Sequence, residues 1–114
     1  MNDLADKIEA AEGPSRELFL AAMHEAHGEQ DDNSPILQRM EELIVHEAWL
    51  DAAMTLVPEG FGVGLDVYDD GAAPRAQLVA EGYRFIARNS GGSIALALCA
   101  AALKARQSLQ EPKP

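Results

Sequence analysis

Residues 94–103 form an unbroken apolar run, and this run constrains the fold more than any other feature of the sequence. Ser93 precedes it as a candidate helix N-cap, and Lys104 and Arg106 bring cations to its C-terminal end, where the helix dipole favours them. The run is too short to cross a bilayer, and a helix that is apolar on most faces is normally buried. We therefore predict a buried C-terminal helix over residues 93–108, lying across a sheet and against another helix.

The segment that precedes this helix has a side-chain period of two. Apolar residues alternate with small or polar ones over residues 61–68, and similar but weaker patterns follow over residues 75–81 and 83–88. Turn-forming residues separate the three segments. We therefore predict a three-stranded antiparallel meander over residues 61–88.

Residues 1–34 are predicted to form a helical N-terminal arm. Apolar side chains recur at helical spacing over residues 3–12, and Ser15 is placed to cap a second helix that ends at Gly28. Polar, acidic residues 28–33 then form a loop.

Residues 35–58 are predicted to form one long helix. Ser34 is a candidate N-cap, and Pro35 suits the first helical position. Apolar residues follow at intervals of three and four, with a kink expected near His46. Whether residues 19–46 are rigid helices or a mobile arm stays open at this stage.

These elements predict an α+β fold of order ααα-βββ-α. On the strand of residues 61–68, Gly62 and Gly64 share one face, and we expect this face to receive the alanine-rich C-terminal helix. The opposite face then needs cover from the helix of residues 35–58, so the meander is expected to be sandwiched between helices in three layers. We expect residues 1–109 to be a single domain and residues 110–114 to be a disordered tail.

Charge is distributed unevenly along the chain, whose formal net charge is −10. Residues 1–74 hold 17 acidic and 3 basic residues (−14), and residues 75–114 hold 2 acidic and 6 basic residues (+4). An acidic surface repels phosphate, so we expect a basic protein partner rather than direct binding to nucleic acid. The simpler interpretation, that the acidic residues keep the protein soluble, stays open.

No motif in the sequence predicts an enzyme or a cofactor. His24, Glu25 and His27 have the spacing His-Glu-x-His, which differs from the zinc motif whose histidines lie four residues apart. Whether His24, His27 and His46 bind a metal stays open, although we expect none. Cys99 lies in the apolar run, where cysteine behaves as a small hydrophobic residue.

Three segments, residues 4–18, 51–60 and 92–106, resemble small phage and prophage proteins of the phage α-β-α sandwich domain family. The resemblance implies a helix, an antiparallel hairpin or meander and a terminal helix, and it carries over no functional residue. The chain departs from the family's pattern at Ile94, where such proteins often have proline after the cap. The middle segment, residues 19–46, looks particular to this chain.

We therefore expect a cytoplasmic, non-enzymatic acidic protein of phage or mobile-element origin that binds a basic host surface. Its most concrete form is an inhibitor of a nucleic-acid-directed defence complex, of the anti-CRISPR kind, that acts as a phosphate mimic. The predicted contact residues are acidic and lie mainly in the middle segment: Glu25, Glu29, Asp31, Asp32, Glu41 and Glu42. The alternative is a self-associating phage structural or assembly protein, with contacts between oppositely charged parts of the chain.

Overall fold

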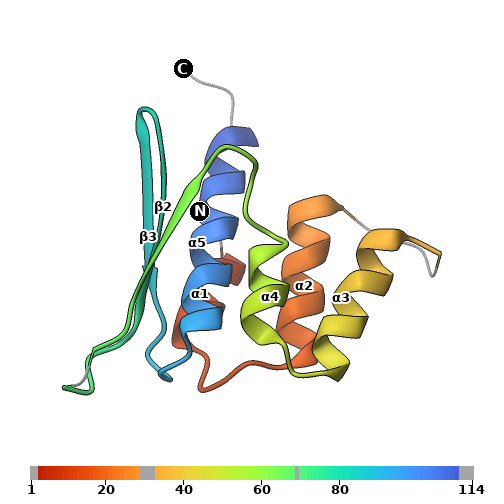
Figure 1. The fold of residues 1–114 in the computed structure, drawn as a ribbon, viewed down its shortest axis with the longest axis horizontal. Coiled ribbons are helices and arrows are strands. Elements are labelled where there is room, and N and C mark those ends of the chain that lie inside the picture. Colours follow the sequence, from red (N-terminus) through yellow and green to blue (C-terminus); the bar gives the residue numbers. More distant parts are fainter. Residues whose placement is uncertain (1–2, 29–32, 69, 111–114) are drawn as a thin grey trace.

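The computed structural model describes residues 3–28, 33–68 and 70–110, and the predicted tail lies almost wholly outside them. The elements, in chain order, are α1 (Asp3–Ala10), α2 (Arg16–His27), α3 (Pro35–Val45), α4 (Trp49–Met54), β1 (Gly62–Asp66), β2 (Arg75–Ala80), β3 (Tyr83–Arg88) and α5 (Ile94–Gln110). The α+β class and the order of helices, antiparallel strands and a final helix are confirmed (Figure 1).

Serine side chains start three of the helices, as the sequence predicts. Each hydroxyl oxygen accepts a hydrogen bond from a backbone N–H three residues later: Ser15 from Leu18, Ser34 from Leu37 and Ser93 from Leu96. At the other end of α2, Gly28 adopts a positive φ of 79° and its N–H donates to the carbonyl oxygen of His24. These are local signals that satisfy backbone groups left open at helix ends.

The prediction of one helix over residues 35–58 is wrong in that the chain forms two helices, but the kink expected near His46 lies where the chain breaks between α3 and α4. Glu47 has a left-handed φ of 54°, and the N–H of Ala48 donates to the carbonyl oxygen of Leu43 at 2.8 Å, which closes α3. The break redirects α4 so that Trp49 packs against Phe19 of α2, with ring centroids 5.1 Å apart. The kink expected near His46 is thus a complete turn, and the packing of the two aromatic rings accompanies it.

Helix α5 lies at the centre of the molecule and is buried along most of its length. It packs against α1, α4, β2 and β3, with the sheet on one side of it and α4 on the other in Figure 1. Its many alanines, from Ala95 to Ala105, leave room for these neighbours to approach closely. The predicted buried C-terminal helix is thus confirmed.

The three strands form a meander in the order β1-β2-β3. Residues paired across antiparallel strands share a face of the sheet. The face toward α5, the inner face, carries the rows Val63, Leu78, Phe85 and Leu65, Ala76, Ala87. The opposite face, the outer face, carries the rows Gly62, Val79, Arg84, then Gly64, Gln77, Ile86, and finally Asp66, Arg75, Arg88.

The predicted three-layer arrangement is wrong in two respects. All of the helices lie on one side of the sheet, so α3 and α4 cover neither of its faces (Figure 1). In addition, Gly62 and Gly64 lie on the outer face, away from α5. The apolar residues of β1, Val63 and Leu65, face α5 instead. Val79 and Ile86 on the outer face are accordingly 46% and 39% exposed.

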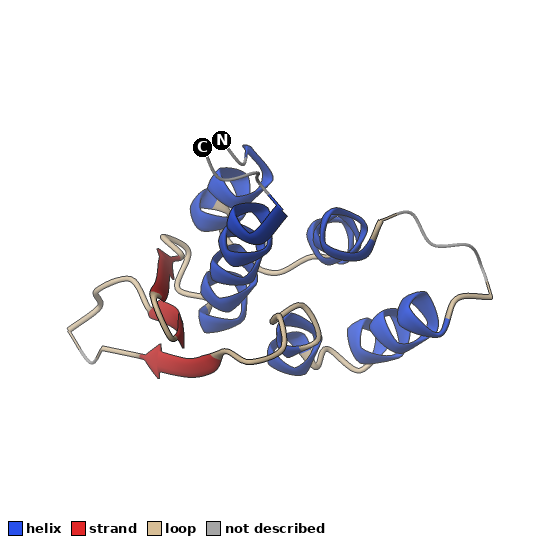
Figure 2. Ribbon diagram, turned by 90° about the horizontal axis from the view of Figure 1, so that it is seen from above, coloured by secondary structure: helices blue, strands red, loops and turns tan. Residues whose placement is uncertain are grey.

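Helix α3 lies at the end of the molecule opposite the sheet, beside α2 and α4. Figure 2 shows the sheet at one end and α2 and α3 at the other, with α5 and α4 between them. The apolar side of α3 contributes Met40, Leu43 and Ile44 to the core. This arrangement separates the helices rich in acidic residues from the outer face of the sheet.

Candidate functional site

The predicted acidic contact residues do not form one free surface in the described part of the chain. Glu29, Asp31 and Asp32 lie outside the described residues. Glu41 forms an ion pair with Arg16, and Glu42 lies 3.6 Å from Arg39. Glu25 is exposed on α2, and no described cation lies within ion-pair distance of it.

A second set of carboxylates lies where α2 begins, α3 ends and α4 begins. Glu17 is in the first turn of α2, Glu47 follows α3, and Asp51 is in the first turn of α4. The Arg16–Glu41 pair and the contact between Phe19 and Trp49 hold these helix ends together. They lie at the lower end of the helices in Figure 1.

We refer to Glu17, Glu41, Glu42, Glu47 and Asp51 as the acidic end. All but Glu41 are exposed, and Arg16 and Arg39 are the cations that pair within it. Five carboxylates and two guanidinium groups leave a net formal charge of −3 on this end. Glu17, Glu47 and Asp51 have no ion pair to the described part of the chain and are free to meet a cation from outside.

The outer face of the sheet has the opposite charge. Arg75 is neutralised by Asp66 at 2.7 Å, and the hydrogen bond to this carboxylate raises the pKa of Arg75. Arg84 and Arg88 bind neutral oxygens instead, those of the Gln77 side chain (2.9 and 3.1 Å) and of the Ala73 carbonyl (3.2 Å). Both guanidinium groups are therefore held in place, and neither forms an ion pair with a described carboxylate.

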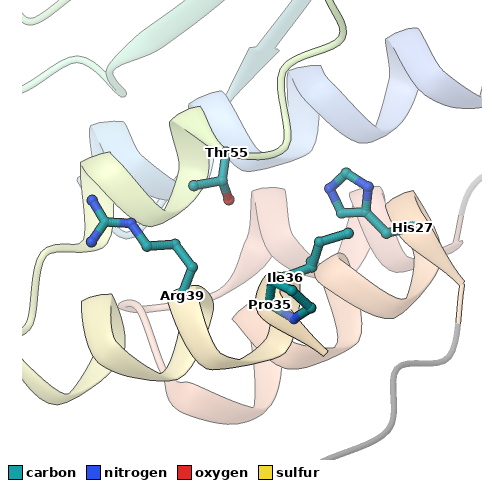
Figure 3. Close-up of a pocket in the computed structure, with 5 residues that line it drawn as sticks. All are labelled: His27, Pro35, Ile36, Arg39 and Thr55. Atoms are coloured by element: carbon teal, nitrogen blue, oxygen red, sulfur yellow. The ribbon is translucent and has the colours of Figure 1, made fainter. Parts of the chain in front are cut away.

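A cavity of about 270 Å³ opens between the helices that form the end of the molecule opposite the sheet. Its lining consists of His27, Pro35, Ile36, Arg39 and Thr55, whose side chains converge from α2, α3 and the end of α4 (Figure 3). The Thr55 hydroxyl donates to the carbonyl oxygen of Ala52 at 2.6 Å, which leaves it poorly placed as a nucleophile. The cavity offers a largely apolar wall with one guanidinium at its edge.

His27 lines this cavity, but the histidines do not form a metal site within the described residues. Within those residues, no three His, Cys, Asp or Glu side chains are grouped so that they could hold a metal ion. Burial, and to a lesser degree the charge of Arg106, lowers the pKa of His27. Nδ1 of His24 is buried and has no hydrogen-bond partner in the described structure.

Cys99 is fully buried in α5, as the apolar run predicts. Burial raises the pKa of its thiol to about 12. A thiolate is therefore scarce at neutral pH, and the residue has no nucleophilic or ligand role in this state.

Arg106 lies near the C-terminal end of α5, as the sequence predicts, but it has a second role that the sequence does not reveal. Its charge at a helix C-terminus is visible in the sequence, but its guanidinium also binds the carbonyl oxygens of Leu56 and Ala26. These carbonyls lie at the C-terminal ends of α4 and α2, so one cation serves helix ends that are far apart in the sequence. No local pattern points to this contact.

Comparisons with protein-family models, with curated proteins and with solved structures return no match for this chain. Among the helices of the described residues, none is both long and apolar enough to span a membrane.

Proposed function

We propose that this protein acts by binding a basic surface of another protein, and that the acidic end is the part that makes contact. The observation that carries the proposal is the separation of charge in the fold. Within the described residues, carboxylates without an ion pair lie at the meeting point of α2, α3 and α4, while arginines without an ion pair lie on the outer face of the sheet. A cationic partner is drawn to the first region and repelled by the second.

In its most specific form, the proposal is inhibition of a host defence complex that handles nucleic acid. Such complexes carry cationic channels for phosphate backbones, and rigidly held carboxylates can occupy these channels as a phosphate mimic. Glu17 and Asp51 lie in the first turns of α2 and α4, and the contact between Phe19 and Trp49 joins these two helix ends. The resemblance of the sequence to phage proteins supports this setting, with action in the cytoplasm of the host cell.

The proposal is tested by competition on purified RNA-guided nuclease complexes. Target-DNA binding is measured with and without this protein over a range of salt concentrations. The protein should displace DNA, and Glu47→Lys combined with Asp51→Lys should abolish the effect. Glu59→Lys combined with Glu81→Lys makes the same change in net charge on exposed residues outside the acidic end and should leave competition largely intact.

Equal loss in both double variants would reduce the effect to net charge alone, and the acidic end would have no special role. Unchanged DNA binding with every complex tested would remove the inhibitor proposal. That result would leave the description of the fold unchanged.

The second candidate is self-association as a phage structural or assembly protein. The specific observation in its favour is that the acidic end belongs to the helical part of the molecule and the basic outer face to the side of the sheet away from the helices, which suits head-to-tail contact. Light scattering at increasing salt tests this function. Head-to-tail chains should shorten as salt screens the charges, whereas a size that stays constant at all salt concentrations contradicts it.

A further inference from the structure

The sheet has two outer edges, and the described residues close only one of them. On β3, Lys104 Nζ donates to the carbonyl oxygen of Ile86 at 3.3 Å, and the backbone N–H of Arg88 donates to Glu9 Oε2 at 3.2 Å. Glu9 and Lys104 also pair with each other at 2.9 Å. Side chains from α1 and α5 thus occupy the edge of β3, which protects it from further strand pairing.

These contacts also reveal which backbone groups face outward on β1. In an antiparallel sheet, the N–H and C=O of one residue point to the same side, and successive residues alternate. The backbone groups of Ile86 and Arg88 point to the outer edge of β3, so those of the residues between them bond to β2. The same alternation, carried through the strand register, fixes which backbone groups of β1 bond to β2. This register means that the backbone N–H and C=O groups of Gly62, Gly64 and Asp66 point toward β2. Val63 and Leu65 therefore direct their N–H and C=O groups outward.

The outer edge of β1 has none of the protection found at β3. No described side chain or backbone group forms a hydrogen bond to Val63 or Leu65 at this edge. The strand contains no proline or lysine, and its one charge, Asp66, is held by Arg75. Apolar side chains are left partly uncovered beside it, with Leu65 39% and Val67 72% exposed.

We propose that the edge of β1 pairs with β1 of a second copy of this chain, antiparallel and centred on Gly64. In this register, Val63 lies opposite Leu65 of the second copy, and the two residues exchange both backbone hydrogen bonds. Because the two copies are related by a two-fold axis, Leu65 of the first copy pairs with Val63 of the second in the same way. The result is one continuous sheet across both copies, with an isologous contact.

The side chains of β1 are self-complementary in this register. On the inner face, Val63 meets Leu65 of the second copy, and the exposed Val67 lies opposite Phe61 of the second copy. On the outer face, Gly64 meets Gly64, and Gly62 lies opposite an Asp66 that Arg75 already neutralises. Apolar groups thus face apolar groups, and no uncompensated charge lies in the new ladder. This match points to a second copy rather than to an unrelated strand.

Charge predicts how this dimer responds to salt. Each copy carries a formal net charge of −10, so two copies repel each other, and salt should strengthen the pairing. Head-to-tail association of the acidic end with the outer face should show the opposite response. The response to salt therefore tests pairing of β1 edges independently of both candidate functions.

The first test is a disulfide at the two-fold axis. Gly64 faces Gly64 as a non-hydrogen-bonded pair, where Cα atoms are about 4.5 Å apart, within the range that a disulfide spans. Gly64→Cys should therefore form a covalent dimer on mild oxidation, after the flexible Gln77 side chain moves slightly. Gly62→Cys is the matched control on the same face, and its two copies would be about 13 Å apart. Cys99 is buried and should not interfere.

The second test removes one outward N–H. Leu65→Pro deletes a donor that β2 does not use, and proline is tolerated at such an edge position. Leu65→Ala shortens the same side chain but keeps the N–H. Sedimentation of the full chain should give a concentration-dependent dimer for the native protein, a weaker dimer for Leu65→Ala and a monomer for Leu65→Pro. Far-ultraviolet circular dichroism of each variant reports whether it is folded.

Preferential crosslinking of Gly64→Cys supports the proposal even if Leu65→Pro does not fold. A native protein that remains monomeric at every concentration and salt level overturns it. So does crosslinking of Gly62→Cys at the same rate as Gly64→Cys, because random collision would then account for both. Selective incorporation of a heterologous strand peptide at this edge, without dimerisation, would reassign the edge to a different partner.

Discussion

The side-chain amide nitrogen of Asn89 donates a hydrogen bond to the carbonyl oxygen of Ile8 at 2.8 Å. The same nitrogen donates to Ala11 at 2.9 Å, while Oδ1 accepts from the backbone N–H of Ser93 at 2.9 Å. Asn89 is fully buried, and it joins the end of α1 to the turn between β3 and α5. One side chain thus satisfies backbone groups from two segments that are about 80 residues apart, as the separations of 81 and 78 residues show.

Asn89→Leu should therefore destabilise the protein by about 3 kcal/mol, because it leaves buried carbonyl and N–H groups without partners. Urea denaturation measures the free energy of unfolding. Ser90→Ala is the matched variant, since its exposed hydroxyl reaches Glu9 only at 3.3 Å, and it should cost less than about 1 kcal/mol. Similar losses in the two variants would contradict a special role for Asn89.

Gly91 occupies the same turn and should not accept a side chain. A Cβ atom there would lie 2.4 Å from the carbonyl oxygen of Glu12 and 2.5 Å from that of Ala11, and both are backbone atoms that cannot swing away. We expect Gly91→Ala to lower stability by about 1–3 kcal/mol through this overlap. Gly13→Ala, where no atom lies within 4 Å of the new Cβ, is the control in thermal denaturation and should change the Tm little.

Arg106→Met should cost about 2 kcal/mol, since the carbonyl oxygens of Leu56 and Ala26 lose a charged donor at two helix C-termini. Arg39→Met removes an exposed arginine whose partner, Glu42, lies 3.6 Å away, and it should cost less than about 0.5 kcal/mol. Chemical denaturation of both variants makes the comparison. Equal effects would show that Arg106 acts only as a surface charge.

His27 should make the protein less stable in mild acid. Burial lowers the pKa of His27 in the folded state below its ordinary value of 6.5, so the unfolded chain binds a proton more readily. The stability contributed by neutral His27 is complete above pH 6.5 and is lost as the pH falls from there toward the folded-state pKa. His27→Gln should remove this part of the pH dependence in urea titrations. An undiminished slope in the variant would assign it to other groups.

Cys99 should be unreactive in the folded protein. Its pKa of about 12 and its burial leave neither a thiolate nor an access path for an alkylating reagent. Iodoacetamide labelling at mildly alkaline pH, followed by mass spectrometry, should be negligible without denaturant and complete in urea. Rapid labelling of the native protein would show that α5 is more accessible than its packing indicates.

Local residue patterns were sufficient to predict the class of fold. Ser15, Ser34 and Ser93 cap helices through atoms only three residues away, and a period of two marks the strands, so neither signal needs distant parts of the chain. The burial of α5 also follows from its sequence, because an apolar surface on every side cannot remain in water.

Tertiary structure alone decided the rest, because the deciding atoms are distant in the sequence. The sequence predicts a kink near His46, but the complete break beside Glu47 is accompanied by packing of Trp49 on Phe19 of a different helix. Glu41 belongs to an ion pair because Arg16, 25 residues earlier, lies beside it. Which face of β1 meets α5, and which edge of the sheet is closed, likewise depend on contacts that no short stretch of residues encodes.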